Sequence, residues 1–568
     1  MAIFHHSICG NLARSPIIPF LLLFFVWLAP SSSRAQSLPD RFVWMFGWNL
    51  SRDSDVDEMT KVLETAAEHG INGAVMSLGL DSLSTKSPSY FRRLQQIEAV
   101  CDRHELELIP AIFSIGYGGS ALVHDRNLAE GVPVVDAPFM VREGTAELVA
   151  DPDVAFRNAD FEAYQGNRFA GWQFHDAPGE VSFVDTAVKH SGDASLRLEN
   201  FTANPHGHGR VMQQVQLHPH RCYRLSVWVR TENLKPTNSF MVQVLVGDRP
   251  IAPRKFQLSS TGDWQKLTLV FNSLDHDSVR VYAGMWGGIA GKLWVDDWAI
   301  EEIGPLNVLR RPGTPVSVKC EDGTVEFVEG EDFQRIEDPQ LNPYRADGPV
   351  PSIRIPAESR IKLGETLQVS WYHSQVINAS QVTICMAEPR LYEIYEQEAK
   401  LLAERLHPKR VFLNADEIRM GGTCQACGGR DMAELLGECL TKITEILRRH
   451  MPGVEIYVWS DMLDPNHNAH ADYHLVNGDF NGSWNHVPED LILAVWGNEP
   501  REESMKFFSG QGFRTLASCY YDADDLEQVR LWFKIVKGTQ GARGMMYTPW
   551  EKKYELLDDF GDLIRVDF

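Results

Sequence analysis

The fold is decided by the stretch Phe42-Val43-Trp44-Met45-Phe46-Gly47-Trp48, an apolar and aromatic run that is typical of a buried strand. Residues 55–69 follow with apolar side chains at helical spacing and stop at a glycine. Residues 71–78 predict a second strand, 87–104 a second helix and 106–114 a third strand. This βαβαβ order is typical of a parallel sheet with helical crossovers.

The pattern changes between residues 158 and 303, where short strands alternate with turns. The segments 195–198, 223–229 and 265–271 are examples, separated by Gly, Asp and Asn. Strands at this spacing predict an antiparallel β-sandwich. A further β-rich stretch, which contains Pro and Gly, continues to about residue 364.

The alternation of helices and strands then resumes. Helices are expected over 391–406 and 432–450, and strands over 410–414, 454–459, 491–496, 514–519 and 544–547. With the first three strands these make eight, the number of a TIM barrel. We therefore predict an α/β fold, a (β/α)8 TIM barrel interrupted after its third strand by an all-β jelly-roll sandwich insertion. Residues 367–373 are a ninth candidate strand, which we place at the exit of the insertion.

These patterns divide the chain into a signal peptide and two kinds of domain. Residues 1–36 contain Arg14, an apolar run over 17–30, and small residues before a cut at Gln36, which predicts a secretory signal peptide. An uncleaved anchor is the alternative. The barrel is assigned to 37–125 and 366–568. The β-rich insertion is assigned to 126–365, with the sandwich over 154–305. After signal cleavage we expect a secreted or periplasmic protein without a membrane span.

Composition excludes some partners. The 568 residues carry 54 Lys+Arg against 77 Asp+Glu, a formal charge of −23. Such an excess of negative charge repels nucleic-acid phosphates and anionic membrane surfaces, so we expect neither as a partner.

Eight cysteines lie outside the signal segment, and two of them form a Cys-x-x-Cys motif at Cys424 and Cys427. This motif could be half of a zinc site, but no second Cys-x-x-Cys or His-x-x-x-His follows at the spacing of a zinc finger. A disulfide or free thiols are therefore favoured, and no metal is predicted in the barrel.

Barrel active sites form where the strands end, and aromatic residues and carboxyl groups gather there in this sequence. The candidates are Asn414, Asp416 and Glu417, then Trp459 and Asp461, then Trp496, then Tyr520 and Tyr521, and finally Tyr547, Trp550 and Glu551. Aromatic faces pack on sugar C–H groups, and carboxyl groups bind hydroxyls and transfer protons. A carbohydrate pocket is predicted, although Asp416 followed by Glu is also typical of a helix N-cap.

The segment 413–417 resembles the segment that closes the fourth barrel strand of the family 20 glycoside hydrolases, of the β-N-acetylhexosaminidase type. Leu108-Ile109-Pro110-Ala111 resembles the third strand of the same family. The His and two Gly of that family's motif are absent here, and the resemblance covers about half of the chain. It implies that Glu417 is the general acid/base and that Asp416 orients the substrate's acetamido group. It further implies that Tyr520 or Tyr521 holds the acetamido oxygen, that Trp459, Trp496 and Trp550 wall the pocket, and that Glu551 binds a hydroxyl.

The inserted sandwich resembles carbohydrate-binding modules of the family 4/9 type. The resemblance rests on 158–162, Gly171-Trp172, 190–196 and 294–298. It implies a structural Ca²⁺ with Glu162 and Asp297 as candidate ligands. Trp228, Trp264 and Trp286 are candidate sugar platforms, with core packing as the alternative.

The sequence thus predicts a secreted glycoside hydrolase that cleaves a poly- or oligosaccharide, with an N-acetylhexosaminide among the candidate substrates. No cofactor is expected for catalysis. With an enzymic nucleophile, Glu551 or Glu499 is the second carboxylate. The alternatives are a non-catalytic glycan-binding protein with a degenerate barrel, and a metal-dependent deacetylase or lyase built around His467.

Overall fold

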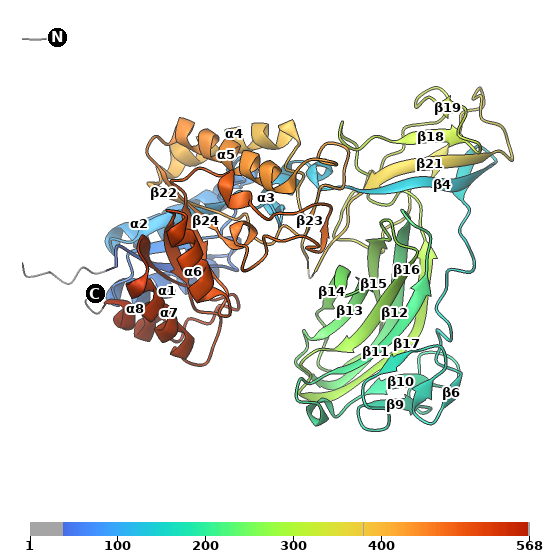
Figure 1. Ribbon diagram of the computed structural model, residues 1–568, viewed down its shortest axis with the longest axis horizontal. Coiled ribbons are helices and arrows are strands. Elements are labelled where there is room, and N and C mark those ends of the chain that lie inside the picture. The colour runs from blue at the N-terminus through green and yellow to red at the C-terminus, as the bar shows by residue number, and fades with distance from the viewer. Residues whose placement is uncertain (1–37, 379, 566–568) are drawn as a thin grey trace, which may run out of the picture.

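The computed structural model describes residues 38–378 and 380–565. A barrel with its helices forms one end of the molecule, and antiparallel β-structure forms the other (Figure 1). The predicted signal peptide lies outside the described residues. Within them, no helix combines the length and the apolar character that crossing a membrane requires.

Eight parallel strands close into a barrel in the order β1-β2-β3-β22-β24-β26-β27-β28. They are β1 Asp40–Met45, β2 Gly73–Met76, β3 Glu107–Ile112, β22 Arg410–Leu413, β24 Glu455–Trp459, β26 Ile492–Val495, β27 Arg514–Ser518 and β28 Ala542–Tyr547. β3 pairs directly with β22, although some 300 residues separate them along the chain. The barrel is therefore assembled from two distant pieces of sequence.

Alternation along the strands separates an inner core from an outer one. Side chains such as Phe42, Trp44, Ile109, Phe412 and Tyr457 fill the barrel interior. Their neighbours on the strands face outward and pack against the helices. The α-helices of the barrel are α1 Asp53–Glu68, α2 Pro88–Arg103, α4 Pro389–Leu406, α5 Met432–His450, α6 Arg501–Gly510, α7 Glu527–Gly538 and α8 Leu557–Arg565.

The prediction of a regular (β/α)8 barrel is wrong, because helices do not alternate with all of the strands. The connection from β24 to β26, described throughout, has no α-helix. It contains the 3₁₀ turns η4 Asp461–Leu463 and η5 Ser483–Asn485 and the short strand β25 Leu475–Val476. Its sequence is rich in Asp, Asn, Gly and Pro, which favour turns over helix. The connection from β3 to β22 holds the short helix α3 Gly119–His124, the insertion, and α4.

Two five-stranded antiparallel sheets form the inserted sandwich, with a shared core that includes Leu196, Val227, Phe240 and Val281. One has the order β15-β12-β17-β10-β9, with bounds Gly262–Asn272, Cys222–Lys235, Ala290–Glu302, Ser195–Leu198 and Ser182–Asp185. The other has the order β14-β13-β16-β11-β8, with bounds Arg249–Phe256, Phe240–Val246, Ser278–Met285, Gly209–Gln216 and Phe174–His175. A small hairpin, β6 Tyr164–Gln165 and β7 Arg168–Phe169, lies beside it.

The insertion is also more than one sandwich, which corrects the second half of the fold prediction. A separate six-stranded sheet has the order β19-β18-β21-β4-β5-β20 and its own core (Figure 1). The bounds are Glu326–Phe327, Ser317–Cys320, Thr366–His373, Val132–Arg142, Thr145–Leu148 and Ile353–Arg354. The ninth candidate strand is β21, which pairs antiparallel with β4 and lies outside the barrel.

The chain leaves and re-enters the barrel at neighbouring points. Glu130 N donates to Thr383 O at 2.8 Å, and Cys385 N donates to Leu128 O at 2.8 Å. The entry and exit of the insertion therefore form a paired stem. The sandwich also contacts two barrel connections through the short parallel pair of β23 (Met420–Gly421) and β25.

Candidate active site

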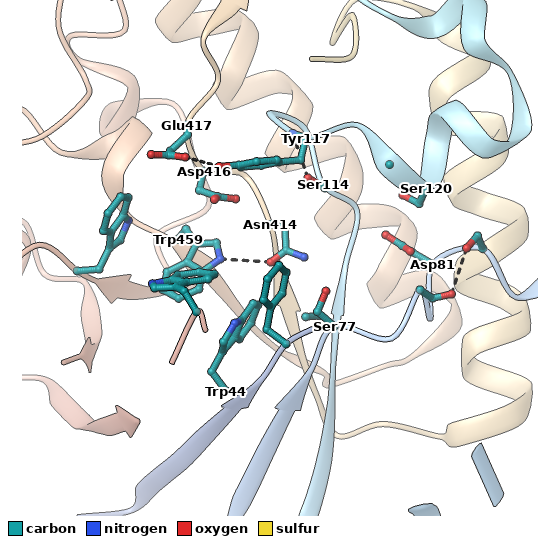
Figure 2. Close-up of a pocket in the computed structure, with 17 residues that line it drawn as sticks. Trp44, Ser77, Asp81, Ser114, Tyr117, Ser120, Asn414, Asp416, Glu417 and Trp459 are labelled. Carbon is teal, nitrogen blue, oxygen red and sulfur yellow. Dashed lines mark hydrogen bonds between the residues drawn. The ribbon is translucent and has the colours of Figure 1, made fainter. Parts of the chain in front are cut away.

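A cavity of about 620 Å³ lies where the barrel strands end. Figure 2 shows the residues that line it, with Asp416, Glu417 and Tyr117 gathered on one side and tryptophans below them. The lining residues are Trp44, Phe46, Ser77, Gly79, Asp81, Ser82, Ala111, Ser114, Tyr117, Gly119, Ser120, Asn414, Asp416, Glu417, Trp459, Trp496 and Trp550.

Glu417 is held by two side chains. Its Oε1 accepts a hydrogen bond from Arg419 at 2.5 Å in an ion pair, and its Oε2 accepts one from the Tyr117 hydroxyl at 2.5 Å. Gln381 accepts from the same Arg419 at 2.6 Å and donates to the Glu417 backbone carbonyl at 2.5 Å. Both partners are hydrogen-bond donors, and the Arg419 guanidinium also places a positive charge beside the Glu417 carboxyl group.

Asp461 lies behind this pair and is fully buried. Its Oδ2 accepts from the Glu417 backbone N–H at 2.8 Å and from the Asn468 amide at 2.8 Å. Its Oδ1 accepts from the Trp496 indole at 3.3 Å. Asp461 thus fixes the loop after β22 and the position of one wall.

The Asp416 carboxyl differs from its neighbour in having no cation paired directly with it among the described residues. Burial raises the pKa of Asp416 well above its usual range, and the nearby charges of Asp461 and Glu417 raise it further. Its side chain still lines the cavity. The two adjacent carboxyl groups therefore lie in different environments, one paired with a cation and one without.

Tryptophans form one wall of the cavity. The Trp44 ring lies 5.3 Å from Trp459 and 5.7 Å from Trp550, centroid to centroid. Trp459 donates to Asn414 Oδ1 at 3.2 Å, which fixes its orientation. Phe46 and Trp550 stay 40% and 37% exposed, so they form the aromatic rim of the opening.

Small hydroxyl side chains and Asp81 line the other side. Burial raises the pKa of Asp81, whose Oδ2 accepts from the Phe113 backbone N–H at 2.6 Å. Ser77, Ser82, Ser114 and Ser120 are the hydroxyl residues of this side. The cavity therefore combines an apolar aromatic wall with groups that can exchange hydrogen bonds with a polyhydroxylated ligand.

Gly116 allows the loop after β3 to approach the carboxyl pair. A Cβ at this position would lie 2.2 Å from the Asp416 carbonyl oxygen and 2.8 Å from that of Glu417. The loop is also held by the Thr383 hydroxyl, which donates to Gly116 O at 3.1 Å. This close approach brings Tyr117 to Glu417.

The structure brings together six of the residues predicted for the pocket: Asn414, Asp416, Glu417, Trp459, Trp496 and Trp550. Asp461 supports them from behind. Glu551 and Glu499 are not lining residues. His467 contacts the Trp496 ring edge-on but belongs to no group of three or more candidate metal ligands among the described residues.

The three predicted tyrosines also lie outside the cavity lining. The hydroxyl of Tyr520 donates to Ala523 O at 2.9 Å, that of Tyr547 to Lys553 O at 2.9 Å, and that of Tyr521 to Ser518 O. The rings of Tyr520 and Tyr547 stack at 4.1 Å. These side chains hold the strand-exit loops together.

Sequence reasoning missed the contribution of the first three strands. Trp44 is the last residue but one of β1, Ser77 and Asp81 follow β2, and Ser114 and Tyr117 follow β3. Barrel active sites form where the strands end, so the ends of the first three strands identify these residues as candidates as well. Arg419 carries no comparable signal beyond its place two residues after Glu417.

In the sandwich, both predicted calcium ligands contact the loop 190–194. Glu162 accepts from the Asp193 backbone N–H at 2.8 Å, and Asp297 accepts from the Ser191 hydroxyl at 2.8 Å. Calcium binding here stays a prediction. Trp228 is half-buried and stacks on His190 at 3.9 Å.

No family model matches the chain, the family 20 hydrolases included, and no curated protein matches it. Similar solved structures include a family 4 carbohydrate-binding module, 17% identical over 26% of this chain and 99% of that chain, with a TM-score of 0.20. A family 22 xylan-binding domain from Paenibacillus barcinonensis is 15% identical over 27% and 95%, with a TM-score of 0.19. A cyclase from Fischerella sp. TAU is 17% identical over 27% and 96%, with a TM-score of 0.22.

Proposed function

We propose that the chain binds carbohydrate in the barrel cavity and hydrolyses a glycosidic bond there. The observation that carries the proposal is the pair Asp416 and Glu417, two carboxyl groups with different environments in one aromatic-walled cavity. Most glycoside hydrolases use two carboxyl groups, of which one donates a proton to the leaving oxygen.

Binding would use both sides of the cavity. Its volume lies within the range of small-molecule sites. A sugar ring would pack its C–H face on the wall formed by Trp44, Trp459 and Trp550, and its hydroxyls would face Asp81 and the serines. Aromatic and hydroxyl groups suit a neutral glycan better than a strongly anionic one, because the carboxyl groups would repel the latter.

The environments of the carboxyl groups support a division of roles opposite to the one that the family resemblance implies. Asp416 would hold the proton at rest, because its pKa is raised by burial. Glu417 would be the partner carboxyl group, since Arg419 and Tyr117 hold its two oxygen atoms in place. We propose Asp416 as the proton donor and Glu417 as the carboxylate that stabilises the developing positive charge or activates the attacking group.

The acetamido preference has little support in this site. The tyrosine hydroxyls that would hold an acetamido oxygen are bonded to backbone carbonyls. We therefore propose a poly- or oligosaccharide substrate without a required 2-acetamido group.

The test is hydrolysis of a panel of aryl glycosides with and without the 2-acetamido group. Glu417→Gln and Asp416→Asn should each lower kcat/KM by about 10²–10⁴-fold, the usual contribution of a catalytic acid or base. Glu555→Gln, an exposed carboxyl group that does not line the cavity, is the matched control and should keep wild-type activity.

Binding distinguishes hydrolysis from its alternative. Glycan binding, followed by tryptophan fluorescence, should persist in Glu417→Gln. If wild type binds glycans but hydrolyses none of a broad panel, the chain is a non-catalytic glycan-binding protein and the enzymatic proposal fails.

A further inference from the structure

Three thiols and one carboxyl group meet in a buried cluster at the stem of the insertion. The cluster consists of Glu130, Cys385, Cys424 and Cys427, all at most 1% exposed. The Sγ atoms of Cys385 and Cys424 are 3.5 Å apart, and those of Cys424 and Cys427 are 3.3 Å apart. Cys427 Sγ lies 2.9 Å from Glu130 Oε1. All four ligand atoms lie within 4.8 Å of one another.

We infer that this cluster is a structural Zn²⁺ site with three thiolates and one carboxylate as ligands. Four such atoms around one point match the tetrahedral geometry that zinc prefers. Zn–S bonds of about 2.3 Å place two tetrahedral thiolates about 3.8 Å apart, close to the spacing seen here. A disulfide would need the sulfur atoms at about 2.05 Å, well below these separations.

The surroundings of the cluster fit a bound cation with anionic ligands. The Thr423 hydroxyl at 2.9 Å and the backbone N–H groups of Thr423 and Cys424 at 3.2 and 3.0 Å donate to Glu130 Oε1. Such contacts orient a ligating carboxylate. The buried guanidinium of Arg311 forms an ion pair with Glu388 and also interacts electrostatically with Cys385, Cys424 and Glu130.

A tight turn presents two of the ligands. Gly428 N donates to Cys424 O at 2.7 Å, and Cys427 N donates to the same carbonyl at 3.3 Å. The turn places both thiols of the Cys-x-x-Cys motif on one side. The other two ligands do not form a second motif, because Glu130 and Cys385 come from the two hydrogen-bonded segments of the stem. Four protein ligands fill the coordination shell, which is typical of a structural site rather than a catalytic one.

The location indicates what the metal would do. Glu130 precedes β4 at the entry of the insertion, Cys385 precedes α4 at its exit, and the two other ligands follow β23. One Zn²⁺ would therefore tie the insertion stem to the connection that also carries Asp416 and Glu417. Binding would release the thiol protons to solvent, since zinc binds thiolates.

The test is the metal content of the full chain, purified under reducing conditions and dialysed against ZnSO₄ and then against metal-free buffer. Wild type should retain about one zinc per chain, as a single four-ligand site predicts. Cys427→Ser and Cys385→Ser should lose at least about nine-tenths of it, because each removes a thiolate ligand. Cys101→Ala, which removes a buried thiol on α2, is the matched control and should retain the metal.

Cobalt provides a readout that does not depend on the folding of variants. Co²⁺ added to zinc-free wild type should give thiolate-to-metal charge-transfer bands in the near ultraviolet and intense visible bands of tetrahedral Co²⁺. Both should disappear when Zn²⁺ is added. Chelation should also lower the Tm, because a ligand that binds only the folded state stabilises it.

Two results would overturn the site. One is wild type that retains no zinc and gives no thiolate bands with Co²⁺. The other is a disulfide between two of these three cysteines, found by peptide mass mapping of protein isolated without reductant, with no bound zinc. Neither result bears on hydrolysis, so the zinc site and the proposed activity can fail separately.

Discussion

At the scale of single residues, the site stores backbone strain at Glu417. Its φ of +47° lies in the left-handed region, which costs a non-glycine residue about 1–3 kcal/mol. The surroundings maintain this conformation, because Asp461 accepts the Glu417 N–H and Gln381 donates to its carbonyl. Arg419 and Tyr117 then fix the side chain. Adjacent residues in an ordinary strand would point to opposite faces, and this turn lets both carboxyl groups line one cavity.

Asp416 should make folding depend on pH. Its folded pKa is raised, so the folded state holds the proton more tightly than the unfolded state. The stability that proton binding by Asp416 contributes is fully present at pH values below the unfolded pKa. It is lost as the pH rises through the folded pKa. Asp416→Asn removes the ionisation, so its free energy of unfolding relative to wild type should increase as pH rises, by about 1.4 kcal/mol for each unit of pKa shift, and its Tm should rise relative to wild type in the same direction.

Differential scanning fluorimetry between pH 4 and pH 9 measures this Tm difference. Asp57→Asn, which replaces an exposed carboxyl group on α1, is the matched control. A constant difference for Asp416→Asn would show that Asp416 has the same pKa in the folded and unfolded states.

At the scale of elements, strand positions and strand ends could be predicted, but the paths of the loops could not. All eight barrel strands overlap the predicted segments, because apolar runs bounded by turn residues identify them. Trp459, Trp496 and Trp550 lie where the strand-end rule puts them. The tyrosines at the ends of β27 and β28 do not, since Tyr520 stacks on Tyr547 and neither ring lines the cavity. Such rotamer choices depend on packing between distant segments.

The loop after β3 should depend on Gly116. In Gly116→Ala the new Cβ would overlap backbone atoms of Asp416 and Glu417, which cannot move aside as a flexible side chain can. We expect a loss of about 1–3 kcal/mol in the free energy of unfolding, the usual cost of overpacking. Gly119→Ala has nothing within 4 Å of its Cβ and lies in α3, so it should be neutral or slightly stabilising. Urea denaturation measures both, and equal stabilities would refute the close approach.

At the scale of the whole molecule, the interruption after the third strand could be read from the change in period, but its internal architecture could not. The sequence predicts strands in both β-rich stretches. It does not show which strands pair with each other, because strands far apart in the chain have no local sequence pattern that identifies their partner. β4 and β21 lie at opposite ends of the insertion, and they pair in the six-stranded sheet. The zinc ligands are scattered for the same reason: the stem brings Glu130 and Cys385 together with a motif nearly 300 residues after Glu130.

The sandwich should also stabilise the barrel connection that supports the site. Arg249, on β14, donates from Nη2 to Val476 O at 3.0 Å and from Nε to His474 O. Arg249→Ala leaves these partly buried carbonyls without their donor, at a cost of about 1–3 kcal/mol. β25 pairs with β23, which follows Glu417 and Arg419 in the chain. The loss of the Arg249 hydrogen bonds should therefore increase local opening in both the β24–β26 and the β22–β24 connections.

Hydrogen exchange measured by mass spectrometry follows this local opening. Peptides covering 470–480 and 418–424 should exchange faster in Arg249→Ala, whereas those from α1 and α2 should not change. Arg280→Ala is the matched control, since Arg280 binds Gly247 O and Asp248 within the sandwich. Faster exchange confined to the sandwich would mean that the barrel connections hold their shape alone. Faster exchange in both connections would show that the insertion supports the loops carrying Glu417 and Asp461.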